Sequence, residues 1–179
     1  MSRPLLVSID GKSGSGKSTL AEMIRQKVRA SVISGDDFFA GGEAVTNVSP
    51  EKLVEICIDW QALRRVLKQL HLSEAACFFA YDWMAFDGSR KSEMTCIEAL
   101  DVVLLEGVYS ARPELRDLVD LTVLLEISDG ERLRRLLARE GKISPWERQW
   151  HCAEDWYFAT SAPRESFDVV LDGTAASAT

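Results

Sequence analysis

The sequence predicts an α/β fold in which a mainly parallel sheet of about five strands is covered by helices on both faces. Short apolar runs typical of strands recur along the chain, and stretches with helical spacing separate most of them. A glycine-rich loop directly follows the first run. This alternation is typical of parallel sheets, because a crossover helix returns the chain to the start of the next strand. The predicted strands are 5–9, 31–34, 76–80, 102–105, 121–127 and 167–171.

Three helices are predicted from spacing and from their starts. Residues 60–70 carry an apolar stripe of leucines and a valine at helical spacing. Ser128 and Ser144 each precede a glutamate by three residues, which is the pattern of a capping box, and Pro145 suits the first helical position. We expect a single domain over 1–174, with an irregular segment at 40–48 and a flexible tail at 175–179.

The composition excludes several classes of protein. The chain has 179 residues, 46% of them hydrophobic, which is enough for one ordinary core. Its net charge of −7 argues against a nucleic-acid partner, which requires a basic surface. No apolar leader or membrane-length run occurs, so we expect a soluble cytoplasmic protein that does not bind membranes. The four cysteines form no C-x-x-C pair, and we expect them to be reduced thiols.

Residues 11–19 read Gly-Lys-Ser-Gly-Ser-Gly-Lys-Ser-Thr and match the pattern G-x-x-x-x-G-K-[ST]. The glycines let the backbone turn tightly, so that successive N–H groups and the start of the next helix cradle phosphate groups. We therefore expect the three-layer sandwich of a P-loop NTPase, with ATP and Mg²⁺ bound at this loop. Lys17 is expected to reach the β- and γ-phosphates, and the Ser18 hydroxyl to ligate Mg²⁺. The expected nucleotide contacts are Gly11, Ser13, Gly14, Ser15, Gly16, Lys17, Ser18 and Thr19.

Acidic residues follow two of the predicted strands, at the edge of the sheet where ligands collect. Asp36 and Asp37 come after the second strand, and Glu106 ends the run 102–105. A carboxylate near the γ-phosphate can accept the proton of an attacking hydroxyl, and a second carboxylate can orient Mg²⁺ and its waters. We expect Ser18, Asp36 and Glu106 to form the metal site. The alternatives are a turn or helix cap for the two aspartates and an ordinary strand end for Glu106.

Basic residues gather within 132–148, a region expected to be an Arg-rich lid. Arg132, Arg135 and Arg139 recur at spacings of three and four and therefore share one helix face. Such a cluster suits a mobile lid that stabilises charge on the transferring phosphoryl group, and Arg135 and Arg139 are its expected catalytic members, together with Lys17. The alternative is a solvated helix face paired with nearby glutamates.

Together these motifs resemble the uridine kinase and nicotinamide riboside kinase group of P-loop nucleoside kinases, from about residue 5 to residue 173. The segment 31–39 is similar to the one in which that group places its catalytic acid, and Asp36 is the matching residue. The resemblance further implies that Asp59 holds ribose hydroxyls and that Gly173 lies close to the adenine. The acceptor-binding residues that it implies are Asp36, Phe39, Asp59, Tyr81 and Asp82.

Uridine kinases usually carry a histidine after the Tyr-Asp pair. This chain departs from that pattern and has Phe86 nearby instead. We therefore expect phosphoryl transfer to a small alcohol, a nucleoside 5′-hydroxyl first and nicotinamide riboside as an alternative. A nucleoside-monophosphate kinase would need a second phosphate site, for which Arg64, Arg65, Lys68 and Arg90 are candidates. A nucleotide-binding switch is the remaining alternative, and the sequence has neither the N-K-x-D nor the D-x-x-G motif of GTPase switches.

Overall fold

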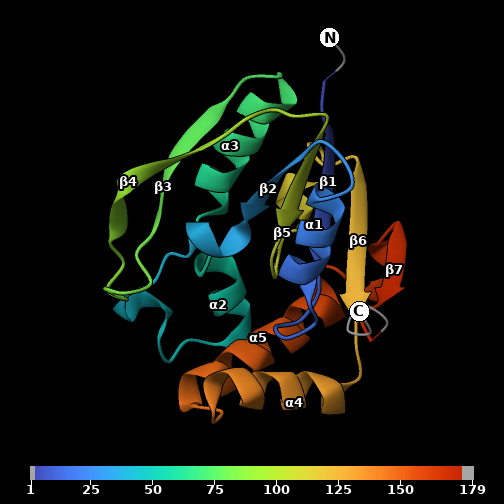
Figure 1. Ribbon diagram of the computed structural model, residues 1–179. Helices are drawn as coiled ribbons and strands as arrows, with labels where there is room; N and C mark the ends of the chain where they lie inside the picture. The colour runs from blue at the N-terminus through green and yellow to red at the C-terminus, as the bar shows by residue number, and fades with distance from the viewer. Residues whose placement is uncertain (1–2, 175–179) are drawn as a thin grey trace.

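The computed structural model describes residues 3–174 and is built around a five-stranded parallel sheet (Figure 1). The strand order is β2-β5-β1-β6-β7, and each neighbouring pair is parallel. The strands are β1 (Leu5–Asp10), β2 (Ala30–Ser34), β5 (Val102–Glu106), β6 (Leu121–Glu126) and β7 (Val169–Asp172). The predicted α/β fold class is confirmed, and the tail predicted at 175–179 lies outside the described residues.

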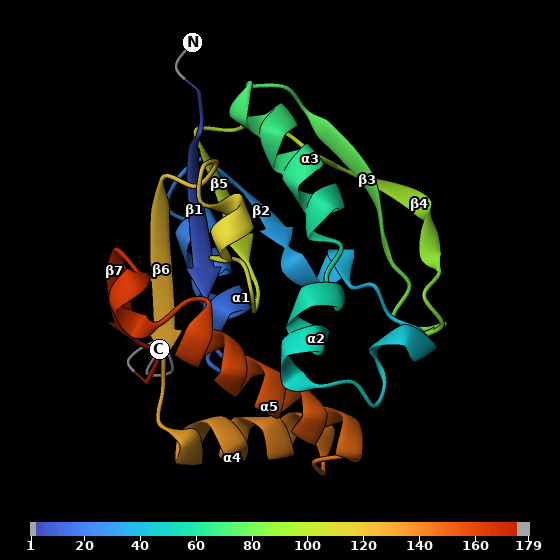
Figure 2. The same cartoon turned by 180° about the vertical axis from the view of Figure 1, so that it is seen from behind.

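Helices cover both faces of this sheet, as the two opposite views show (Figures 1 and 2). Helix α1 (Lys17–Arg25) places Ala21 against Ile9 and Leu104 on one face. Helices α2 (Pro50–Ile56), α3 (Trp60–His71) and α5 (Pro145–Thr160) pack on the other face, over Leu6 and Leu105. Because side chains alternate along a strand, Leu6 and its neighbour Val7 belong to opposite cores.

Helix α4 (Asp129–Glu140) and helix α5 follow one another across the carboxyl edge of the sheet. The Ser144 hydroxyl accepts from the Glu147 backbone N–H, and the Glu147 carboxylate accepts from the Ser144 backbone N–H, which completes the predicted capping box. At Ser128 only half of the predicted box forms. The Ser128 hydroxyl accepts from the Glu131 backbone, but the Glu131 carboxylate pairs with two arginines farther along α4.

A separate antiparallel hairpin of β3 (Ala76–Tyr81) and β4 (Arg90–Ile97) runs along the outside of the molecule (Figure 1). The prediction of a strand at 76–80 is confirmed, but its assignment to the parallel sheet is wrong. Strand β4 was not predicted, because its exposed, charged residues form no apolar run. Cys77 and Cys96 face each other across the hairpin and form a disulfide, so the prediction of four reduced thiols is wrong for this pair.

The helices of residues 3–174 include none with the length and apolar character that crossing a membrane requires.

Candidate functional site

The glycine-rich loop joins β1 to α1 and lies at the carboxyl edge of the sheet. Gly11 has a positive φ of 149°, and a Cβ at this position would lie 2.4 Å from the carbonyl oxygen of Leu125. Only glycine fits here, because the loop backbone passes directly over β6. Gly16 then caps the start of α1, so the first amides of that helix open toward the loop.

Asp10, at the end of β1, anchors this loop through hydrogen bonds. It was not singled out by the sequence analysis. Its side chain is fully buried and accepts hydrogen bonds from the backbone N–H groups of Gly11, Tyr109 and Ala111 at 2.7, 3.1 and 2.9 Å. The hydroxyl of Tyr157, on α5, donates to the same carboxylate at 2.9 Å. Asp10 therefore fixes the phosphate loop, the segment after β5 and helix α5 relative to one another.

Lys17 is 8% exposed, and its ammonium group lies across the loop. It donates to the carbonyl oxygens of Gly11 and Lys12 at 2.8 and 3.1 Å. The Ser18 hydroxyl points the other way and donates to Glu106 Oε2 at 3.0 Å. The loop thus presents a held positive charge on one side and a hydroxyl–carboxylate pair on the other.

Asp36 and Asp37 lie in the single turn η1 (Gly35–Phe38) that follows β2. The Asp36 side chain opens into the cavity beside the loop. Loss of hydration among the surrounding protein atoms raises its pKa above that of a free aspartate, while the positive charges of Lys17 and Arg139 oppose the shift. Asp37 does not line this cavity, and its carbonyl oxygen accepts from Arg90 at 3.1 Å. The structure therefore separates the two adjacent acids and brings Asp36 to the loop.

Glu106 ends β5 and is 6% exposed. Burial raises the pKa of Glu106, the nearby Asp36 carboxylate raises it further, and Lys17 and the hydroxyls of Ser34 and Ser18 lower it. Two mutually repelling carboxylates and a hydroxyl form an oxygen-rich set that suits a hard divalent cation. Among residues 3–174 no three His, Cys, Asp or Glu side chains form a metal-binding group, so such a cation would rely on phosphate oxygens as well.

The loop, Asp36 and Glu106 share one cavity of about 950 Å³. The aromatic residues that line it are Phe39, Trp83, Phe86, Trp146 and Trp150, and together they form an aromatic wall. The rings of Phe39 and Trp83 are stacked, with centroids 5.0 Å apart. Trp83 is 45% exposed, so much of its side chain stays outside the core. The sequence analysis missed Trp146 and Trp150, which α5 brings to the cavity.

The other predicted acceptor residues, Asp59, Tyr81 and Asp82, do not line the cavity. The Asp59 carboxylate caps α3 by accepting from the Ala62 backbone N–H at 2.9 Å. Tyr81 is fully buried and packs edge-on against Phe39. The Asp82 carboxylate accepts from the Met84 backbone N–H at 2.9 Å and shapes the hairpin turn. Of the predicted acceptor contacts, the structure brings Asp36 and Phe39 to the loop.

The predicted lid arginines divide between two directions. Arg135 and Arg139 line the cavity beside the phosphate loop, whereas Arg132 turns toward Glu154 on α5. Arg135 donates to the carbonyl oxygens of Ser15 and Gly173 at 3.2 and 3.3 Å and so connects the loop to the segment after β7. A Cβ on Gly173 would lie 2.7 Å from the Ser15 carbonyl oxygen, so glycine permits this close approach.

The candidates for a second phosphate site lie elsewhere. Arg64 pairs with Asp117, and Arg90 donates to the Asp37 carbonyl. Arg65 and Lys68 line a small depression beside Cys77. None of these four side chains is among the residues that line the cavity at the loop, which argues against a monophosphate acceptor.

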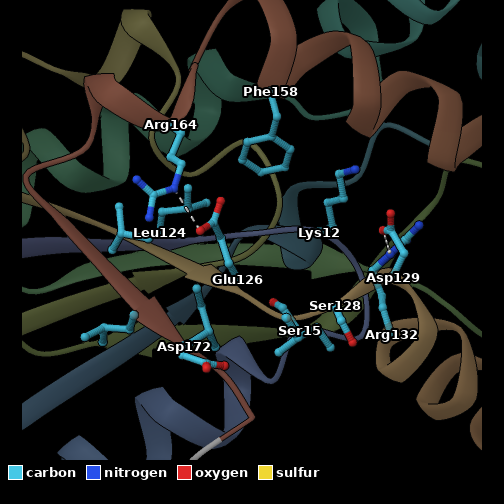
Figure 3. A pocket seen from close by; sticks show the side chains of 14 residues that line it. Lys12, Ser15, Leu124, Glu126, Ser128, Asp129, Arg132, Phe158, Arg164 and Asp172 are labelled. Carbon is cyan, nitrogen blue, oxygen red and sulfur yellow. Dashed lines mark hydrogen bonds and ion pairs between the residues drawn. The ribbon is translucent and has the colours of Figure 1, made fainter.

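A second cavity, of about 700 Å³, lies at the ends of β6 and β7 on the side of α5 (Figure 3). Its cationic side chains each have a carboxylate partner: Arg164 with Glu126, Lys12 with Asp155, and Arg132 with Asp129 and Glu154. The positive charge of this cavity is therefore already balanced, and the phosphate-binding features converge on the larger cavity.

The fold and the loop define a nucleotide-binding protein of the P-loop class, and comparisons with known proteins identify its family. Residues 6–143 match the family model described as "Phosphoribulokinase / Uridine kinase family", and the chain belongs to this family. It is 30% identical to a uridine kinase of Mycoplasma pneumoniae over 179 residues, which cover 91% of this chain and 78% of the relative. It is 28% identical to a uridine kinase of Clostridium novyi over 149 residues, which cover 79% and 71% of the two chains.

Solved structures agree with the fold. The structure of a possible uridine kinase from Bacillus stearothermophilus aligns over 96% of this chain and 90% of that chain, with a TM-score of 0.69 and 24% identity. The D-glycerate 3-kinase of Cryptococcus neoformans aligns over 97% and 88%, with a TM-score of 0.60 and 16% identity. At these identities the structures show a shared fold, and family membership makes this chain an ATP-dependent kinase.

Proposed function

We propose that this enzyme transfers the γ-phosphoryl group of ATP to the 5′-hydroxyl of a nucleoside. The observation that carries the proposal is the shared cavity, which the phosphate loop, Asp36 and the aromatic wall line together. The loop supplies a site for the triphosphate, the carboxylate a proton acceptor, and the rings a surface for a flat base.

Asp36 is the proposed base. Its carboxylate accepts the proton of the acceptor hydroxyl, the hydroxyl oxygen bonds to the γ-phosphorus, and the bond from that phosphorus to the bridging oxygen of ADP breaks. A raised pKa makes the Asp36 carboxylate a better proton acceptor than that of a free aspartate. The position of Asp36 beside Lys17 supports this role.

Lys17, Arg135 and Arg139 are proposed to stabilise the negative charge of the phosphates. The two loop carbonyls that hold Lys17 keep its ammonium group at the loop before ATP arrives, which reduces the reorganisation needed on binding. Arg139 is exposed at the rim of the cavity, so a small movement of α4 would change its distance to a bound phosphate. We propose that residues 132–148 close over the triphosphate as a lid.

Ser18, Glu106 and Asp36 are the residues that would hold Mg²⁺, the two carboxylates acting mainly through water. When bound, Mg²⁺ neutralises charge on the β- and γ-phosphates. The raised pKa of Glu106 supports this proposal, because a neighbouring cation would relieve the repulsion between Glu106 and Asp36.

The aromatic wall supports a nucleoside over an aliphatic alcohol, because stacking on several rings favours a planar base. Nicotinamide riboside is the second candidate. Its pyridinium ring carries a positive charge, and the cavity combines aromatic side chains with the carboxylates Asp36, Glu140 and Glu147.

A transfer assay with radiolabelled ATP and Mg²⁺ tests the acceptor. The acceptors compared are uridine, cytidine, nicotinamide riboside, uridine monophosphate and glycerate, each at the same concentration. We expect labelled product with a nucleoside and none with the monophosphate. Labelling of the monophosphate or of glycerate alone would overturn the proposed acceptor class.

A further inference from the structure

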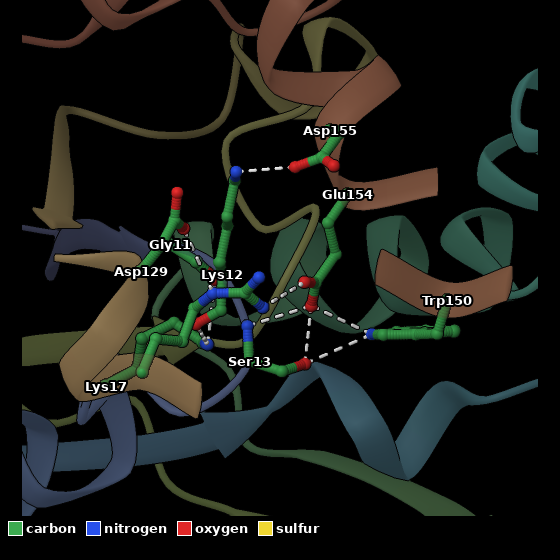
Figure 4. Close-up of polar contacts among 9 residues, drawn as sticks. Gly11, Lys12, Ser13, Lys17, Asp129, Trp150, Glu154 and Asp155 are labelled. Atoms are coloured by element: carbon green, nitrogen blue, oxygen red, sulfur yellow. Dashed lines mark hydrogen bonds and ion pairs between the residues drawn. The ribbon is translucent and has the colours of Figure 1, made fainter. Parts of the chain in front are cut away.

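Glu154 is a buried carboxylate that touches the phosphate loop without lining either cavity. It lies on α5, one helical turn after Trp150, and is 0% exposed. Burying an ionised carboxylate is costly unless donors surround it, and here they do. The donors come from both the phosphate loop and the aromatic wall (Figure 4).

One oxygen of Glu154 accepts hydrogen bonds from both the phosphate loop, where ATP would bind, and the aromatic wall, where the phosphoryl acceptor would bind. Its Oε1 accepts from the Ser13 backbone N–H at 2.8 Å and from the Ser13 hydroxyl. The same oxygen accepts from Trp150 Nε1 at 2.9 Å, and that N–H also lies 3.1 Å from the Ser13 hydroxyl. Ser13 belongs to the phosphate loop and Trp150 to the aromatic wall, and both line the large cavity.

The second oxygen of Glu154 reaches the lid region. Its Oε2 lies 3.4 Å from Arg132 Nη1 on α4. Helix α4 also lies close to the loop. A Cβ on Gly14 would lie 3.2 Å from the Leu136 side chain. The carboxylate therefore contacts three elements that must be aligned during transfer: the phosphate loop, the wall and the start of the lid.

We propose that Glu154 is a positioning residue that sets the phosphate loop and the acceptor wall through one shared oxygen, so that binding of either substrate favours binding of the other. The inference rests on the proposed kinase function and adds a coupling between its two substrates. A displacement of Ser13 changes the hydrogen bond of Trp150, and a rotation of the Trp150 indole changes that of Ser13. Misplacement of reacting groups by about 1 Å can cost about a hundredfold in rate.

Asp155 is a matched control on the same helix. It is the next residue of α5, and it also contacts the loop, through an ion pair with Lys12. Its side chain is 60% exposed, and exposed ion pairs contribute little. Asp155→Asn should therefore leave kcat and both KM values within about twofold of wild type.

The test measures initial rates of phosphoryl transfer over a grid of ATP and acceptor concentrations. Glu154→Gln keeps the volume but leaves a neutral amide, whose single oxygen is a weaker acceptor for Ser13 and Trp150 and whose NH2 group cannot accept from Arg132. We expect it to raise the KM of both substrates and to lower kcat by about tenfold or more, with a melting temperature close to that of Asp155→Asn. Kinetics of Glu154→Gln that match those of Asp155→Asn would overturn the inference.

Two further variants keep the inference testable if Glu154→Gln does not fold. Ser13→Ala removes a hydroxyl from the loop, and Trp150→Phe removes the indole N–H while keeping a ring. The inference expects Ser13→Ala to raise the KM of the acceptor as well as that of ATP, and Trp150→Phe to raise the KM of ATP as well as that of the acceptor. Effects confined to each residue's own substrate would contradict it.

The two proposals fail in different ways. If wild-type enzyme transfers phosphate to none of the acceptors, the proposed function fails, and the inference is then judged by binding of a non-hydrolysable ATP analogue. Calorimetry should show weaker binding to Glu154→Gln than to wild type, with Asp155→Asn unchanged. If wild-type enzyme is active but Glu154→Gln behaves like Asp155→Asn, the inference fails and the function stands.

Discussion

The Ser18 hydroxyl donates a hydrogen bond to Glu106 Oε2 at 3.0 Å, which joins two residues that are 88 positions apart in the chain. Ser18 lies in the first turn of α1, and Glu106 ends β5 beside β1 in the sheet. The parallel order of the strands produces this meeting, because it brings the ends of β1 and β5 to the same edge. The oxygen atoms of the proposed metal site are therefore assembled by the topology of the sheet.

Magnesium binding should depend on nucleotide. Ser18, Asp36 and Glu106 offer too few direct ligands for a cation that prefers six oxygens and keeps its waters. Calorimetry should detect no Mg²⁺ binding to the free protein at concentrations that saturate its complex with an ATP analogue. Ser18→Ala should weaken Mg²⁺ binding to the complex. Tight binding to the free protein would be inconsistent with this site.

Lys17→Ala should lower phosphoryl transfer by about a hundredfold or more, because removal of a group that stabilises transition-state charge usually has an effect of this size. The ammonium group contacts loop carbonyls and not the hydrophobic core, so the variant should melt near the wild-type temperature. Rates and calorimetric melting curves check the two parts. Retention of more than about a tenth of the activity would exclude the proposed role.

Residues 132–148 should become better protected when both substrate sites are filled. Arg135 and Arg139 line the cavity, and a bound triphosphate would attract their charges and draw α4 toward the loop. Hydrogen exchange in this region should slow on addition of a bisubstrate analogue, while exchange in the central strand β1 stays constant. An unchanged exchange rate in 132–148 would contradict a closing lid and favour the alternative, a solvated helix face.

The Asp36 carboxyl should titrate above the ordinary aspartate value of about 3.9. Its surroundings raise the pKa, so the protonated acid persists to higher pH than in a free aspartate, and base catalysis is lost as pH falls through this raised pKa. Carbon-13 NMR of the carboxyl groups, with Asp36→Asn for assignment, measures the value directly. A pKa at or below that of a free aspartate would contradict the environment described.

The fold and the loop could be predicted because their patterns are local. The phosphate loop is a contiguous motif, and β1, β2, β5 and β6 are apolar runs. Asp36 and Glu106 could be found because each directly follows or ends such a run. Their convergence required the additional rule that ligands collect at the carboxyl edge of a parallel sheet.

The acceptor wall could not be predicted in the same way. Trp150 and Glu154 meet Ser13 across 137 and 141 positions, and nothing in their spacing distinguishes them from packing residues of an ordinary helix. Asp59 and Asp82 match a family pattern, yet their carboxylates cap local backbone. The Cys77–Cys96 pair depends on the register of a hairpin whose second strand carries no apolar signal.

The comparison of Asp36→Asn with Asp37→Asn tests the proposed chemistry most directly. The two residues are adjacent in η1, but Asp36 opens into the cavity and Asp37 does not line it. An amide keeps the shape of the side chain and loses the proton acceptor. The measurement is kcat for both variants under saturating ATP and acceptor, together with their affinity for an ATP analogue. We expect kcat to fall by about a hundredfold or more in Asp36→Asn with little change in ATP affinity, and only mildly in Asp37→Asn. A dead Asp37→Asn beside an active Asp36→Asn would show that the wrong base was assigned, and full activity in both variants would contradict base catalysis by this turn.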